Sequence, residues 1–122
     1  MKPQDFYTKT PASRGVRVEL VDPAGNREWV IVRSVLSSEF AAAITASWAQ
    51  VIAEGPLPSD DRAARKRRNR RVRAALSASL IAEWSLPAEI VPAELLVINP
   101  RLRRQIERIA EDPAVHFGAS HG

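Results

Sequence analysis

Residues 16–35 read VRVELVDPAGNREWVIVRSV, and this stretch decides the fold class. Its first part alternates apolar and polar residues with a period of two, which is typical of a half-buried β-strand. The segment Asp22–Asn26 predicts a turn, because its proline presets φ and either of its last two residues accepts a positive φ. Residues 28–35 are rich in β-branched and aromatic side chains. We therefore predict a hairpin over 15–35, and its apolar face must pack on helices because a lone hairpin is marginal in water.

The segment after the hairpin predicts a helix over about residues 38–54. Ser37 or Ser38 caps its start, and Gly55-Pro56 ends it. Four apolar residues recur at spacings of three and four and share one helical face: Phe40, Ile44, Trp48 and Val51. We predict that this stripe is buried, and we interpret all three tryptophans of the chain as core residues.

A second helix is predicted over residues 60–84. Ser59 is predicted to cap its start. Asp60 and Asp61 have the chemistry of a metal or general-base pair, but we interpret them as capping carboxylates because negative charge stabilises a helix N-terminus. The second half of this helix carries an apolar stripe of core residues: Val72, Leu76, Leu80 and Trp84. The first half is charged on every side, so it must protrude, bind anions or meet an acidic partner.

The C-terminal third predicts a helix over residues 100–111, with Asn99 as cap and Pro100 at the first helical position. A short turn of helix is predicted after Pro92. These elements make one α+β domain over residues 15–117, mostly α-helical, with the N-terminal hairpin packed on three to four helices. Residues 1–14 are predicted to form an extended arm, and residues 118–122 a disordered tail.

Positive charge is concentrated in one segment, Arg62–Arg73. It holds eight of the 18 basic residues, so the rest of the chain, with 14 carboxylates, is acidic. A cationic helix of this kind neutralises phosphates and binds nucleic acid with strong salt dependence. The segment has no aromatic side chain to stack on bases, which weakens the case for single-strand binding. A docking site for an acidic protein segment and a merely solvated face remain as alternatives.

The sequence lacks the motifs of common enzymes. Cysteine is absent, which excludes disulfides and thiolate sites, and the two histidines lie in the last seven residues. The five glycines make neither a dinucleotide fingerprint nor a phosphate loop. No apolar run is long enough for a membrane span, and the N-terminus does not resemble a secretory signal. We expect a non-enzymatic protein of a reducing cytoplasm, without cofactor, metal or membrane partner.

The chain resembles the tail assembly chaperone family of long-tailed bacteriophages. The segment Leu80–Trp84 is similar to the Leu-Ile-x-x-Trp helix end of that family, and Asn99–Ile106 to its Pro-x-Leu-x-x-x-Ile helix start. Phe117 matches the closing aromatic residue of the family pattern. Upstream, the predicted hairpin followed by Ser38-Glu39-Phe40 resembles the opening strand, turn, Trp-containing strand and Ser-x-Phe helix.

The resemblance implies a protein that binds the tape measure protein, keeps it soluble and recruits tail tube subunits around it. It implies a place in the host cytoplasm and absence from the mature virion, and many members are also made in a longer, frameshifted form. The crowded basic segment is not a family feature. We predict that this segment attracts acidic stretches of the client protein, while a groove binds the apolar faces of the client. The predicted partner-binding residues are Arg67, Arg68, Arg70, Arg71, Trp84, Leu86, Leu95 and Leu96.

Two other functions stay open at the level of sequence. A small phage or bacterial nucleic-acid-binding protein would use Arg62–Arg73 and would lose affinity steeply with salt. A minor structural tail protein would be found in purified virions. Self-association is also left open.

Overall fold

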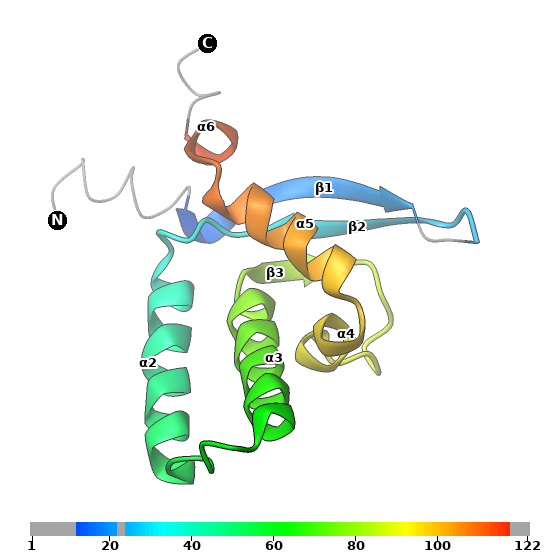
Figure 1. Cartoon of the computed structure of the whole chain (residues 1–122). Coiled ribbons are helices and arrows are strands. Elements are labelled where there is room, and N and C mark those ends of the chain that lie inside the picture. The colour runs from blue at the N-terminus through cyan, green and yellow to red at the C-terminus, as the bar shows by residue number, and fades with distance from the viewer. Residues whose placement is uncertain (1–11, 22–23, 118–122) are drawn as a thin grey trace, which may run out of the picture.

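The computed structural model describes residues 12–21 and 24–117 (Figure 1). The sheet is antiparallel, in the order β1-β2-β3, with strands β1 (Val16–Val21), β2 (Arg27–Val32) and β3 (Ile81–Trp84). The helices are α2 (Ser38–Glu54), α3 (Arg62–Ala78), α4 (Pro92–Ile98), α5 (Pro100–Glu111) and α6 (Pro113–His116). The predicted α+β class is confirmed.

The predicted hairpin is confirmed, with β1 paired to β2 so that Val18 lies opposite Val30. Exposure alternates along β1, as the period-two pattern predicts. The turn uses Gly25, whose φ of 88° is costly for residues with a side chain. On the inner face, Val30 and Val32 are buried at 1% and 0% exposure. The hairpin therefore reaches stability by packing this face on the helices.

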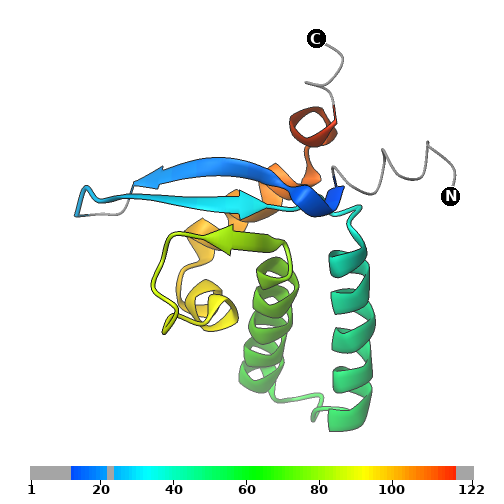
Figure 2. The ribbon, with the colours of Figure 1, turned by 180° about the vertical axis from the view of Figure 1, so that it is seen from behind.

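The arrangement of the helices is seen in two opposite views (Figures 1 and 2). Helix α5 crosses one face of the sheet, while α2 and α3 lie side by side beyond the β3 edge. Helix α4 packs on α3 and leads into α5. The segment between β2 and α2 is tied to α5 by a hydrogen bond from the Val35 N–H to the Ala110 carbonyl, 3.0 Å long. Helix α2 lies at the margin of the molecule, because its main contacts with other elements are those with α3.

The predicted caps Ser37 and Asn99 are confirmed, and α3 is capped by Asp61, one of the two predicted capping carboxylates, and not by Ser59. The side-chain oxygens of Ser37, Asp61 and Asn99 accept hydrogen bonds from backbone N–H groups in the first turns of α2, α3 and α5, at 3.3, 2.9 and 3.1 Å. Asp61 thus acts as a capping carboxylate. The bounds of α2 and α5 agree with the predicted 38–54 and 100–111.

The predicted helix over 60–84 is wrong beyond residue 78. Helix α3 ends at Ala78, the chain turns at Ser79 and Leu80, and residues 81–84 form β3 against β2. Sheet pairing satisfies backbone groups of β2 that would otherwise stay unpaired, and this outweighs the helical propensity of the segment. At the end of the pair, the Ser85 hydroxyl donates to Glu28 Oε2 at 2.6 Å and accepts from the Trp29 N–H at 2.8 Å.

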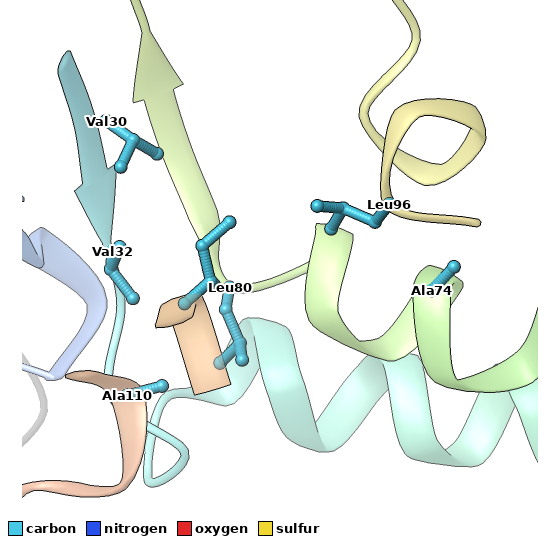
Figure 3. Close-up of a cluster of buried hydrophobic side chains, with 7 residues drawn as sticks. Val30, Val32, Ala74, Leu80, Leu96 and Ala110 are labelled. Atoms are coloured by element: carbon cyan, nitrogen blue, oxygen red, sulfur yellow. The ribbon is translucent and has the colours of Figure 1, made fainter. Parts of the chain in front are cut away.

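The hydrophobic core lies between the sheet, α3, α4 and α5 (Figure 3). Its buried side chains are Val30, Val32, Ala74, Leu80, Leu96, Ile106 and Ala110. Trp84, on β3 opposite Val30, packs against this cluster from the sheet side. Ala12 is also buried, and its carbonyl accepts from the Ser34 N–H at 3.0 Å. Because residues 12–14 form a helical turn, the predicted extended arm is wrong there; its other residues and the predicted tail over 118–122 lie outside the described residues.

The predicted buried stripe of α2 is also wrong. None of the residues of this helix is buried, and Trp48 is 66% exposed. The half-buried face toward α3 is made by Phe40, Ala43, Ser47 and Val51. Small residues at two of these four positions let the helices approach closely, so the larger Ile44 and Trp48 lie at the flank of the contact instead of inside it.

Candidate partner-binding surface

Helix α2 presents a long uncharged surface to solvent. Between Glu39 and Glu54 it carries no charged residue, although most of its positions are exposed. Three large apolar residues on adjacent turns, which we name the α2 stripe, are exposed at 37% for Ile44, 66% for Trp48 and 75% for Ile52. Contiguous exposed apolar surface of this kind is typical of interaction sites.

The α2 stripe borders a groove between α2 and α3, with a volume of about 560 Å³. Ile44, Trp48 and Val51 line it from α2, and Val72 and Leu76 line it from α3. Arginines at positions 65, 68 and 73 complete the lining on the α3 side. An apolar groove with a positive margin suits an amphipathic helix that places apolar residues on one face and carboxylates beside them. We call it the α2–α3 groove.

Charged contacts around Glu54 join the C-terminal end of α2 to α3. Arg71 forms an ion pair with the Glu54 carboxylate, with a second contact from its Nη2 to Oε2 of 2.6 Å. Arg68 lies 3.7 Å from Oε2 of the same carboxylate and donates to the Gly55 carbonyl at 2.8 Å. The hydrogen bond from Arg71 is the main cause that lowers the pKa of Glu54 below its ordinary value, against a smaller opposing effect of desolvation.

Replacing Glu54 by glutamine is expected to lower the thermal midpoint of the protein at about pH 7, and the difference from the native chain is expected to shrink as the pH falls below the ordinary pKa of a glutamate. A carboxylate with a lowered folded-state pKa stabilises the fold fully above its unfolded-state pKa. That stabilisation is lost as the pH falls through the folded-state value. Melting curves of both proteins across this range measure the effect.

The matched control for that experiment is Glu83→Gln. Glu83 is exposed on β3 and has no ion pair with another described residue. The thermal midpoint of the Glu83→Gln variant is expected to stay close to that of the native chain at every pH. A Glu54→Gln difference that persists unchanged at low pH would show that the carboxylate charge does not hold α2 to α3.

The predicted arginines fall into two pairs. Arg68 and Arg71 hold the end of α2, as described, so part of their charge is used inside the molecule. Arg67 and Arg70 are exposed and make no ion pair with another described residue. The basic half of α3 is therefore not free on every side. One flank is fastened to α2, and the free cations lie on the remaining surface.

The predicted apolar residues do not form one open groove. Leu96 is 1% exposed and packs in the core, and Trp84 covers the core from β3. Leu86 and Leu95 are half-buried. Leu96 thus presents almost no side-chain surface to a partner. The α2 stripe and its groove are not among the residues predicted from the sequence to bind a partner. The signal that could have found them is the absence of charge from Ala41 to Ala53.

The described part of the chain contains no group of three or more histidine or acidic side chains arranged to hold a metal ion. Among the helices of residues 12–21 and 24–117, none is both long and apolar enough to cross a membrane. The side chains that the candidate surface exposes are apolar and cationic.

Comparison with family models, with curated proteins and with solved structures gives no match for this chain.

Proposed function

We propose that the chain is a tail assembly chaperone of a long-tailed bacteriophage, which binds the tape measure protein, keeps it soluble and helps to recruit tail tube subunits. The resemblance at Asn99–Ile106, where α5 starts as in the family pattern, supports this role. The resemblance at Leu80–Trp84 does not, because it is to a helix end and residues 81–84 form β3. The single observation that carries the proposal is the α2 stripe beside the α2–α3 groove. A long helical client has apolar faces that aggregate, and an exposed uncharged helix offers them a cover.

Weak, repeated contacts suit this role better than one tight pocket. Several copies of a small protein along a long client gain from a high effective concentration, while each copy can still be released. The groove is open, and its positive margin repels basic segments and attracts acidic ones. The proposed place of action is the host cytoplasm before the tail is complete.

Co-expression with the tape measure protein of the same gene cluster tests the proposal. We expect the large protein to move from the insoluble to the soluble fraction and to copurify with a tagged form of this chain. Purified virions should lack the chain. A tape measure protein that stays insoluble, or a chain that remains in the virion at stoichiometric amounts, would contradict the chaperone role, and the second result would favour a minor structural tail protein.

Nucleic-acid binding is the second candidate function, because Lys66, Arg67 and Arg70 are exposed without an ion pair to another described residue. This function predicts that nucleic acid copurifies with the chain and is released between about 50 and 200 mM salt. Copurification of nucleic acid without the large protein would favour it over the chaperone role.

A further inference from the structure

A second hollow lies beside α3 where α4 ends and α5 begins, and has a volume of about 800 Å³. Lys66, Asn69, Arg70 and Arg73 line it from α3, at spacings that place them on one helical face. Ile98, Pro100 and Arg103 are among the residues that line it from the α4–α5 corner. We call it the cationic hollow.

The lining of the cationic hollow carries four positive side chains and no carboxylate. Glu107, outside the lining, pairs with Arg103 and lies 3.4 Å from Arg73, so it compensates part of this charge. Lys66 and Arg70 have no ion pair with another described residue, and α3 itself contains no acidic residue. Like charges gathered around one concave surface raise the local concentration of an anionic partner.

The wall opposite α3 is apolar apart from Arg103. Ile98 is 78% exposed and Val97 is 38% exposed, both at the last turn of α4. Free phosphate would gain nothing from these side chains, and the lining has no aromatic ring on which a base could stack. An acidic peptide with aliphatic residues between its carboxylates uses both features, because it buries apolar surface against Ile98 while its carboxylates meet Lys66 and Arg70.

We propose that the cationic hollow is a second binding site, specific for an acidic protein segment that carries aliphatic side chains between its carboxylates. It adjoins the α2–α3 groove, with which it shares Asn69 and Arg73. The proposal goes beyond the proposed function, because it stands on charge and shape at the α3–α4–α5 corner and needs neither the α2 stripe nor a phage client.

The probe is a fluorescent synthetic peptide of about 20 residues that alternates pairs of glutamate and leucine, with a twin in which glutamine replaces each glutamate. Fluorescence anisotropy with the full chain measures binding. We expect the acidic peptide to bind, the glutamine twin to bind at least about tenfold more weakly, and a thymidine oligonucleotide of equal charge to bind more weakly than the acidic peptide.

Lys66→Glu with Arg70→Glu is expected to weaken binding of the acidic peptide at least about tenfold. The matched control is Arg62→Glu with Arg104→Glu, which makes the same charge change at exposed positions of α3 and α5 outside the lining, and we expect less than about a threefold effect. Ile98→Ser should weaken binding severalfold, whereas Trp48→Ser should not, which separates this site from the α2–α3 groove. Circular dichroism checks that each variant is folded. If the glutamate pair does not fold, Lys66→Gln with Arg70→Gln takes its place.

Equal loss of affinity in the two charge-reversed pairs would overturn the proposal, since it would show general attraction to basic residues. Tighter binding of the oligonucleotide than of the acidic peptide would also overturn it, and would assign the surface to nucleic acid. Undiminished binding by the Ile98→Ser variant would show that the apolar wall does not contact the peptide, and would contradict the proposed specificity for aliphatic side chains.

Discussion

Replacing Trp48 and Ile52 together by serine is expected to lower the amount of tape measure protein recovered with the chain at least about tenfold, because exposed aromatic and aliphatic anchors dominate such contacts. Both side chains are largely exposed in the chain alone, at 66% and 75%. Serine has nearly the same helix propensity as tryptophan and isoleucine, so α2 is expected to persist. The free energy of unfolding should therefore change by less than about 1 kcal/mol.

The matched control for this prediction removes the same kind of surface elsewhere. Val21 and Leu36 are 70% and 67% exposed, one at the end of β1 and the other before α2. Replacing both by serine is expected to leave client recovery within about twofold of the native chain. If the control pair lowers recovery as much as the α2 pair does, the client recognises exposed apolar surface in general and α2 has no special part.

Leu80→Ala is expected to lower the free energy of unfolding by about 3 to 4 kcal/mol. Leu80 is 2% exposed at the corner between α3 and β3, and it belongs to the core cluster together with Val30 and Val32. The backbone at this corner is fixed on both sides, since the Leu80 carbonyl accepts from the Arg33 N–H at 2.6 Å and its N–H donates to the Ser77 carbonyl at 3.1 Å. The surrounding structure cannot collapse freely into the space left by the side chain.

Urea unfolding followed by tryptophan fluorescence measures this loss. A domain of this size has a total stability of about 5 to 15 kcal/mol, so the variant is expected to be close to the limit of folding at physiological temperature. Leu36→Ala is the control, because Leu36 is 67% exposed and its truncation should cost less than about 0.5 kcal/mol. A loss below about 1 kcal/mol for Leu80→Ala would show that the corner does not anchor the core.

Much of the fold follows from local signals in the sequence. The hairpin is specified by its period-two alternation and its turn, and α2 and α5 are specified by their caps and by the residues that end them. In each case the interactions that decide the structure lie within a few residues of one another. That is why the bounds of α2 and α5 agree with those predicted from the sequence.

The strand β3 could not be read from local signals. Residues 79–84 continue the apolar spacing of α3, and nothing in the segment itself forbids helix. What decides it is a distant partner: the free edge of β2 offers backbone hydrogen bonds that a helix end would leave unused, and Ser85 fastens the pair to Trp29 and Glu28. Such tertiary pairing outweighs a weak local preference.

The kinds of side chain at the candidate site could be predicted from the sequence better than their positions. The basic segment drew attention to α3, and the structure keeps Arg67 and Arg70 exposed on it. The sequence predicts a partner contact at Leu96, which is a core residue, and a core position for Trp48, which is exposed. The spacing of Phe40, Ile44, Trp48 and Val51 is compatible with either of two adjacent helix faces, and only the small residues Ala43 and Ser47 select between them.

Site-specific photo-crosslinking from α2 tests the central claim most directly. A photoreactive phenylalanine analogue is placed at Ile52 in one protein and at Val21 in another, and each is co-expressed with the tape measure protein and irradiated. We expect a covalent product with the tape measure protein from position 52 and none from position 21. A complex that forms normally but crosslinks only from position 21, or equally from both, would contradict the assignment of the exposed face of α2 as the surface that holds the client.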